Sequence, residues 1–279
     1  MHFRLRCPQP PLDAFVESIW VYRNDPYPHA LERVLPTGAA QLIVNLNEDQ
    51  LRIYNPERPH ECTATPGTVL SGARSGCQVI DTAEQQYVAG VVFKPGGCAA
   101  FIREPANETS ETDTPLDLLW GRQQTVDLRD QLLESGSIGE QLDVLEKALR
   151  AQLRSGAVHP AVAFALARFH QVPLTTSIGA LTDVIGMSAK RFIDRFKTDV
   201  GLTPKRYCRV RRFQQAVAQA HRHHRVDWTQ VALDCGYFDQ AHFIHEFRSF
   251  SGLTPSAYQA SRTDLQNHVK FLQSSESAF

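Results

Sequence analysis

The stretch SAKRFIDRFKTDVGLTPKRY, Ser188–Tyr207, decides the fold of this chain, because its landmarks return 51 residues later. Gly201-Leu-Thr-Pro followed by Tyr207 is matched by Gly252-Leu-Thr-Pro followed by Tyr258. At the same offset, Phe192, Ile193 and Phe196 correspond to Phe243, Ile244 and Phe247. Two copies are too few for a solenoid, which needs about three repeats or more. The repeat therefore predicts a small module that occurs twice.

The first copy has the pattern of two helices joined by a glycine turn. Ile178, Leu181 and Ile185 share one helical face, Gly186 supplies the turn, and Ser188 stands where an N-cap belongs. In the second helix the predicted inward residues are Phe192, Ile193, Phe196 and Val200, and the predicted outward residues are Lys190, Arg191, Asp194, Arg195 and Lys197. A helix-turn-helix has this pattern. The alternative is an ordinary helical hairpin with a solvated charged surface.

The second copy repeats the arrangement. Asp227 and Gln230 predict a helix start, Cys235-Gly236 a turn, and Asp239 the start of the next helix. Its predicted inward residues are Phe243, Ile244 and Phe247, and its outward residues are Gln240, His242, His245, Glu246 and Arg248. We expect Gln240 and His245 to contact base edges and Arg248 to contact phosphate.

Between the copies, Tyr207–Ala220 is predicted to form one long helix that holds the two units at a fixed separation. Two recognition helices enter successive major grooves on one face of DNA only when roughly one helical turn, ~34 Å, separates them. Arg209, Arg211 and Arg212 lie on this helix and are predicted phosphate contacts.

Charge is divided unevenly along the chain. Residues 1–156 hold 14 Lys and Arg against 21 Asp and Glu, whereas residues 157–262 hold 14 against 7. An acidic N-terminal half and a basic C-terminal half suggest that only the latter meets a polyanion, unless the charges cluster by chance.

The N-terminal half is predicted to be rich in strands. Short apolar or alternating runs separated by turns favour an antiparallel β-barrel or sandwich; they are 39–47, 50–55, 68–75, 78–83 and 86–94. Helices follow from Cys98, and Ser137-x-x-Glu140 is a capping box before a stripe of Leu142, Leu145, Leu149 and Leu153. This stripe is either an interdomain packing face or a dimer seam. The fold class is thus α+β, with a β-rich domain (1–124), a helical linker or dimerisation segment (125–156), an all-α domain with two helix-turn-helix units (157–262) and a tail (263–279).

About residues 160–260 resemble the DNA-binding domain of the AraC family of bacterial transcription regulators. The resemblance rests on Ser188–Tyr207, on RVRRF at 209–213 and on CGYFDQAHFIHEFRSFSGLTPSAY at 235–258. It implies sequence-specific binding to double-stranded DNA, with Lys190, Arg191 and Asp194 on the first recognition helix and Gln240, His242 and His245 on the second. The family usually has a longer or more basic residue near Asp194. This aspartate therefore either accepts from cytosine N4 or pairs with Arg191 or Arg195.

The N-terminal half resembles, more loosely, the domain of a large AraC subgroup. The matching segments are VLPTGAAQLIVNL at 34–46, GVVFKPGG at 90–97 and LDLLWG at 116–121. The resemblance implies a cupin-like sensing module that binds a small effector, forms a homodimer, or does both, in a regulator that acts with RNA polymerase as an activator. A set of aromatic residues is expected either to line a pocket or to fill the core. They are Trp20, Tyr22, Tyr54, Tyr87, Phe93 and Trp120.

Enzymatic and metal-binding alternatives have weak support in the sequence. A zinc-dependent DNA-alkylation response protein needs a thiolate cluster, but Cys7, Cys62, Cys77 and Cys98 have no paired spacing. His29 and His60, the histidines that a cupin-type metal site would use, are predicted to lie on the surface, and His221–Arg225 is predicted to be a solvated loop. We expect no enzyme, cofactor or metal. A helix-turn-helix module that binds other proteins instead of DNA is the remaining alternative.

The compartment is predicted to be the cytoplasm. The segment 1–11 has no apolar core of a signal peptide, and no stretch approaches the roughly 20 apolar residues of a membrane span.

Overall fold

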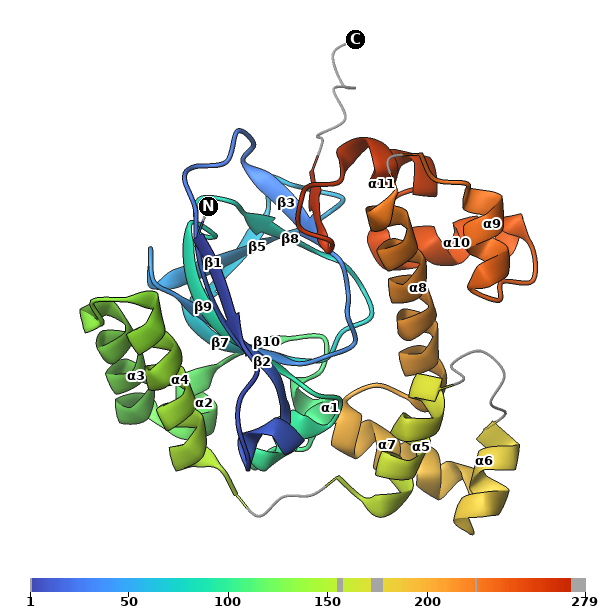
Figure 1. Ribbon diagram of the computed structural model, residues 1–279, viewed down its shortest axis with the longest axis horizontal. Helices are drawn as coiled ribbons and strands as arrows, with labels where there is room; N and C mark the ends of the chain where they lie inside the picture. Colours follow the sequence, from blue (N-terminus) through green and yellow to red (C-terminus); the bar gives the residue numbers. More distant parts are fainter. Residues whose placement is uncertain (1, 155–157, 172–177, 224, 272–279) are drawn as a thin grey trace.

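Two antiparallel sheets form the N-terminal part of the chain in the computed structural model, which describes residues 2–154, 158–171, 178–223 and 225–271 (Figure 1). Within this described part, one sheet has the strand order β1 (His2–Arg6), β2 (Val16–Arg23), β9 (Tyr87–Phe93), β4 (Gln41–Asn45), β7 (Thr68–Ser71), β10 (Asp113–Pro115). The other has the order β11 (His268–Lys270), β3 (Leu31–Val34), β8 (Gln78–Asp81), β5 (Gln50–Tyr54), β6 (Cys62–Pro66). The prediction of an antiparallel β-barrel or sandwich is confirmed as a sandwich.

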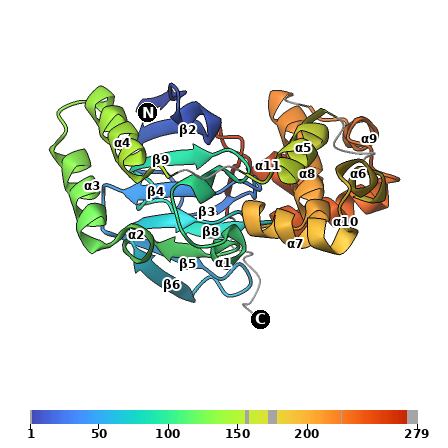
Figure 2. The same cartoon turned by 90° about the horizontal axis from the view of Figure 1, so that it is seen from below.

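The helices after the sandwich fall into two groups. The first group packs on the N-terminal sheets and comprises α1 (Ala106–Thr109), α2 (Leu116–Trp120), α3 (Arg122–Glu134) and α4 (Ile138–Gln152). The second group forms the C-terminal domain and comprises α5 (Pro160–Gln171), α6 (Ile178–Ile185), α7 (Ala189–Val200), α8 (Pro204–Arg222), α9 (Trp228–Asp234), α10 (Gln240–Ser251) and α11 (Pro255–Ser261). Figure 2 shows α3 and α4 on one side of the sandwich and the C-terminal helices on the other, with α1 beside α7. The predicted boundary at 156–157 lies outside the described residues.

Helix α4 packs its leucine stripe inward. Leu142, Leu145 and Leu149 are buried in one cluster with Ile19, Val21 and other residues of the six-stranded sheet, and Leu153 packs at its margin. The stripe is thus a packing face within the chain. The Ser137 side chain caps the helix by accepting from the Glu140 amide, as the capping box predicts, but the Glu140 carboxylate accepts from the amide of Gly136.

The C-terminal domain is tied to the N-terminal sheet by its own last strand. Strand β11 pairs antiparallel with β3, so that His268 lies opposite Val34 and Lys270 opposite Glu32. Val269 is fully buried with Leu35 in the apolar cluster that forms the core of the C-terminal half of the helical domain. The two domains therefore share both a sheet and a core.

A buried carboxylate sits at this junction. Glu32 is 1% exposed and contacts His29 Nε2 at 2.6 Å and His268 Nδ1 at 2.9 Å. Burial raises the pKa of Glu32, but the hydrogen bonds and charges of His268 and His29 outweigh it, so this pKa lies below its ordinary value. The prediction that His29 lies on the surface is therefore wrong, because its ring packs against a buried partner. His60 is exposed, as predicted.

No helix in the described ranges is both long enough and apolar enough to cross a membrane.

Candidate nucleic-acid interface

Each repeat copy folds as a helix-turn-helix, and the local signals for the turns and caps are confirmed. Unit 1 is α6 and α7, and unit 2 is α9 and α10. Gly186 and Gly236 adopt left-handed backbone in the turns. Ser188 caps α7 by accepting from the Arg191 amide, and Asp239 caps α10 by accepting from the His242 amide. These caps fix where each second helix begins.

The phenylalanines of the repeat fill two separate small cores. Phe192 and Phe196 are buried in unit 1, and Phe243 and Phe247 are buried in unit 2. Ile193 is only half-buried and Ile244 is 38% exposed, so the prediction that both point inward is wrong. A residue that follows a buried helical position is turned about 100° away from the core, because an α-helix has ~3.6 residues per turn.

The outer face of α7 is exposed and basic. The predicted outward residues Lys190, Arg191, Asp194, Arg195 and Lys197 are all exposed. Arg195 Nε pairs with the buried carboxylate of Asp199 at 3.1 Å instead of with Asp194. In the described part of the chain, the Asp194 carboxylate has no ion pair, so one of its two alternatives, the pairing with Arg191 or Arg195, is not observed.

The outer face of α10 carries amide, imidazole and guanidinium groups. Gln240, His245 and Arg248 are exposed, and His242 is half-buried with its ring edge-on to Tyr237. Glu246 was predicted to point outward, and this prediction is wrong, because the side chain is buried and only 3% exposed.

Glu246 is held by two arginines of α8. Its carboxylate accepts from Arg209 Nε at 2.7 Å and from Arg212 Nη2 at 2.8 Å. Each guanidinium also lies over a ring: Arg209 over Phe250 at 5.3 Å and Arg212 over Tyr237 at 4.4 Å. Burial and the charge of Glu246 raise the pKa of the Tyr237 phenol. The triad of Arg209, Glu246 and Arg212 thus joins α10 to α8, a role that the sequence analysis missed.

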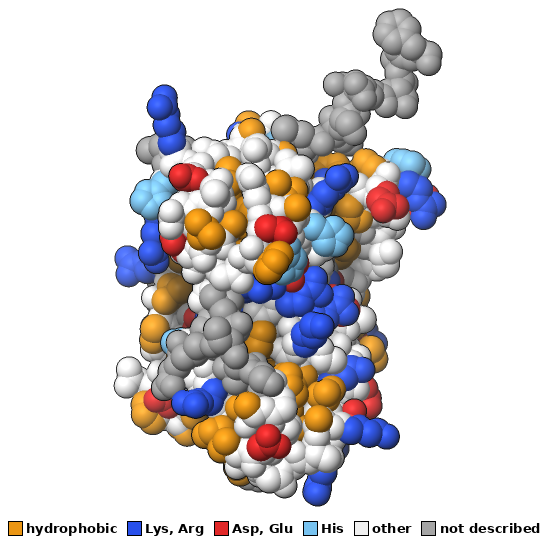
Figure 3. Space-filling model, turned by 90° about the vertical axis from the view of Figure 1, so that its right-hand side faces the viewer, with side chains coloured by type: hydrophobic (Ala, Val, Ile, Leu, Met, Phe, Trp, Pro, Cys, Tyr) orange, Lys and Arg blue, Asp and Glu red, His pale blue; other side chains and the backbone are white. Residues whose placement is uncertain are grey.

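The two units lie on one face with cationic side chains between them. Helix α8 is continuous over Pro204–Arg222, which confirms the long connecting helix. Figure 3 shows Lys and Arg side chains gathered between the upper lobe, which holds unit 2, and the lower lobe, which holds unit 1. Arg211 is half-buried on α8, and Lys205 and Arg206 are exposed near its N-terminus. This arrangement offers two helix faces and a cationic strip between them to one extended anion.

In the described ranges, no cluster of side chains supports metal binding. Within 2–154, 158–171, 178–223 and 225–271, no three His, Cys, Asp or Glu side chains are arranged to hold a metal ion. Burial raises the pKa of the Cys98, Cys208 and Cys235 thiols to about 11, so these thiols stay protonated at neutral pH. The prediction of a solvated loop at His221–Arg225 is wrong for its first two residues, because His221 and Arg222 belong to α8, and His224 lies outside the described residues.

The fold and this paired surface define a tandem helix-turn-helix protein. Residues 181–261 match the family described as Helix-turn-helix domain, and residues 5–115 match a domain of unknown function (DUF6597). Residues 181–261 are thus a helix-turn-helix domain of the AraC type, and the N-terminal part of the chain carries a domain of that second family.

Two curated relatives each match about 30% of the chain. The probable transcriptional regulator LumQ of Photobacterium leiognathi is 31% identical over 86 residues, which is 30% of this chain and 33% of that protein. An uncharacterized HTH-type transcriptional regulator of Haemophilus influenzae is 32% identical over 84 residues, which is 30% of this chain and 28% of that protein. The chain thus spans about a third of the length of the relatives that it matches.

Among solved structures, the chain is similar to ToxT of Vibrio cholerae. An apo variant of ToxT gives a TM-score of 0.48 at 10% identity, covering 88% of this chain and 97% of that one. ToxT with a bound unsaturated fatty acid gives 0.47 at 8% identity, covering 92% and 94%.

Proposed function

We propose that the protein is a sequence-specific DNA-binding transcription regulator that places α7 and α10 in two adjacent major-groove segments. The observation that carries the proposal is the pair of exposed, N-capped helices held on one continuous α8 with cationic side chains between them. The helix-turn-helix family match covers this same region, and both relatives described above are transcriptional regulators. It acts where chromosomal DNA lies, in the bacterial cytoplasm.

Exposed residues of α7 and α10 are proposed to contact bases, whereas other cationic residues contact phosphates or position the helices. Ser188, Lys190, Arg191 and Asp194 on one helix, and Gln240, His242 and His245 on the other, are the proposed base-contacting set. Arg195, Lys197, Arg211 and Arg248 supply phosphate contacts. Arg209 and Arg212 were predicted to do the same. Their bonds to Glu246 favour a positioning role, in which they set the angle at which α10 meets DNA.

The experiment selects duplexes from a random library with the full chain and repeats the selection with variants. Arg191→Ala and His245→Ala are each expected to relax preference at individual base pairs by about 1–3 kcal/mol. Lys147, an exposed cation on α4 far from this surface, is the matched control, and Lys147→Ala should leave the selected sequence unchanged. An unchanged preference in both recognition-helix variants would refute the base-contact assignment.

Salt titration separates this proposal from a protein-binding module. A DNA-binding surface loses affinity steeply with salt, with a slope set by the number of phosphates neutralised. A module that binds only other proteins has no affinity for any duplex, and that result would refute the proposed function.

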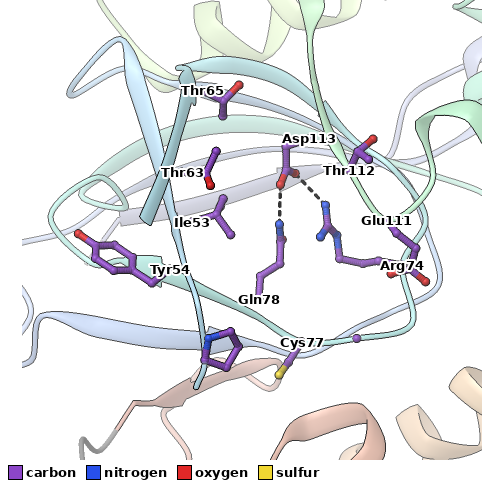
Figure 4. Close-up of a pocket in the computed structure, with 12 residues that line it drawn as sticks. Ile53, Tyr54, Thr63, Thr65, Arg74, Cys77, Gln78, Glu111, Thr112 and Asp113 are labelled. Atoms are coloured by element: carbon purple, nitrogen blue, oxygen red, sulfur yellow. Dashed lines mark hydrogen bonds and ion pairs between the residues drawn. The ribbon is translucent and has the colours of Figure 1, made fainter. Parts of the chain in front are cut away.

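The N-terminal domain is proposed to regulate this activity by taking up a small effector. The support is a cavity of about 430 Å³ between the two sheets, lined in part by Tyr54 (Figure 4). The other aromatic residues of the sequence analysis include Tyr22, Phe93 and Trp120, which are buried in the core. We further propose that the protein forms a homodimer and contacts RNA polymerase.

A further inference from the structure

The turn of unit 2 holds one more residue than the turn of unit 1. In unit 1, Met187 alone stands between the turn glycine and the residue that caps the second helix. In unit 2, both Tyr237 and Phe238 stand between the corresponding glycine and cap. The second helix-turn-helix therefore carries an inserted residue directly before its recognition helix.

The packing around the turn shows which of the two residues is the additional one. The residue before an N-cap often packs on the fourth residue of the helix, as a hydrophobic staple. Met187 is half-buried against the core of unit 1, as this rule expects. In unit 2, Tyr237 takes that place, since it is buried with its ring centroid 4.9 Å from that of Phe243. Phe238 is consequently left outside the core and is 90% exposed.

The outer face of α10 continues this apolar surface. Ala241 is exposed, and Ile244 is 38% exposed. Side chains three and four residues apart share one face of a helix, so these two lie in line with the polar groups farther along. Phe238 stands three residues before Ala241, at the N-terminal end of the same line. This α10 stripe consists of Phe238, Ala241, Ile244, His245 and Arg248, in order from apolar to cationic.

The equivalent face of α7 has a different chemistry. At the 51-residue offset of the repeat, Lys190 of α7 corresponds to Ala241 of α10. Lys190 is exposed, and the inserted Phe238 has no counterpart in unit 1. The two recognition helices therefore present unlike groups at equivalent positions: a cation in unit 1 and apolar side chains in unit 2.

The surroundings of the α10 stripe favour DNA over a protein as its partner. Three apolar side chains are too few for a stable protein interface, which buries about 800 Å² on each partner. The stripe ends at Arg248, and Figure 3 shows hydrophobic and His side chains on the upper lobe above the gathered Lys and Arg side chains. In the major groove, the apolar group that a base edge offers is the C5-methyl group of thymine.

We propose that unit 2 recognises thymine through its C5-methyl group, with Phe238 as the main contact and Ala241 and Ile244 beside it. The inference rests on the proposed function and names part of the base sequence that unit 2 selects. A phenyl ring has no strong hydrogen-bonding group, so it distinguishes thymine from cytosine by the methyl group. The loss of one buried methyl group is expected to weaken binding about fourfold.

The first test removes single methyl groups from the DNA. It uses the full chain and the duplex obtained by selection, in which the half-site of unit 2 is the one whose preference changes in His245→Ala. Each thymine of that half-site is replaced in turn by deoxyuridine, which lacks only the C5-methyl group, and affinity is measured by fluorescence anisotropy. At least one replacement should weaken binding about fourfold, with no comparable effect in the half-site of unit 1. A unit 2 half-site without a preferred thymine, or without an effect of deoxyuridine, overturns the proposal.

The second test assigns the methyl contact to the inserted residue. In Phe238→Ala, the thymine and deoxyuridine duplexes should bind equally, because the ring that contacts the methyl group is gone. Val184→Ala removes another exposed apolar side chain, on α6 of unit 1, and should keep the full difference between the two duplexes. Both residues are exposed, so neither variant is expected to change the melting temperature.

Two outcomes of the second test would overturn the assignment. One is an equal loss of affinity for both duplexes in Phe238→Ala, which would make the ring a contact that reads no methyl group. The other is a difference between the duplexes that persists in this variant. If the chain binds no duplex at all, the proposed function itself fails. If it binds the selected duplex without dependence on any methyl group, the proposed function stands and only this inference fails.

Discussion

At the scale of single residues, Glu246 shows how one side chain sets the geometry of a recognition helix. Its carboxylate is buried on α10 and is bonded to Arg209 and Arg212 of α8. A buried carboxylate is costly unless it is fully paired, so the triad is stable only with all three members present. The orientation of unit 2 relative to α8 therefore depends on this acid as well as on the ring contacts of Phe213 with Phe247 and Phe250.

We predict that Glu246→Gln lowers the free energy of unfolding by about 3 kcal/mol, because two guanidinium groups lose their shared charge partner. The value lies at the low end of the range for buried pairs, since Arg209 keeps partial access to water. Urea denaturation of the full chain measures it. Asp194→Asn, an exposed acid on the other recognition helix, is the control with an expected change below about 0.5 kcal/mol. Equal losses in the two variants would contradict the role of the triad.

The prediction that Glu246 points outward is wrong for a physical reason. The caps at Ser188 and Asp239 and the turns at Gly186 and Gly236 were predictable because each depends on neighbours within a few residues. The partners of Glu246 lie 34 and 37 residues away in the sequence. A charged residue in a helical pattern is usually solvated, and only the tertiary contact reverses this expectation.

At the scale of elements, the C-terminal ends of α7 and α10 are the points where the sandwich contacts the units. Both helices end at a glycine with left-handed backbone, with φ of 92° at Gly201 and 71° at Gly252. The 51-residue repeat identifies both glycines as equivalent positions in the sequence. Both glycines also allow the sandwich to approach closely, and the sequence does not predict this contact. A C-cap glycine has the same local sequence pattern whether it faces solvent or another domain.

We predict a graded loss of stability when alanine replaces the three glycines in turn. Gly186→Ala costs about 1–2 kcal/mol, because it imposes a side chain on left-handed backbone in open space. Gly201→Ala costs about 1–3 kcal/mol more, since its Cβ would meet Ala106 O at 3.1 Å and Ala73 Cβ at 3.3 Å. Gly252→Ala falls between them, because its nearest atom is the flexible end of Arg33.

Urea denaturation gives the order of the three alanine variants. Equal losses at Gly186 and Gly201 would show that the contact with the sandwich adds nothing to the stability of unit 1.

At the scale of the whole molecule, strand β11 makes the two domains one structural unit. His268 of this strand is hydrogen-bonded to Glu32 of β3, which lies 236 residues earlier in the sequence. The sequence predicts only a tail here, because three residues carry too little pattern to predict a strand. The sandwich was predictable from β4, β5, β7, β8 and β9, whereas β1, β2, β3, β6 and β10 were not among the predicted strands. Of these, β6 and β10 lack apolar alternation.

The Glu32 junction predicts how stability depends on pH. Because the folded-state pKa of Glu32 is lowered, its contribution is fully present above the unfolded pKa of about 4.3 and is lost as pH falls through the folded value. The difference in unfolding free energy between the native chain and Glu32→Gln should shrink as the pH falls below about 4. Urea denaturation across this range checks it. A difference that grows on acidification below pH 5 would contradict the assignment.

The place of β11 also has a consequence for the order of biosynthesis. During translation, β3 is made before β4, but the strand that covers its outer edge follows only after α11. At about 5–20 residues per second, the interval between residues 34 and 268 is roughly 10–50 s. Throughout this interval the nascent sandwich exposes an open strand edge, which is a site for pairing with other chains. Messages that end early, for example after residue 262, would release proteins in which this edge is never covered.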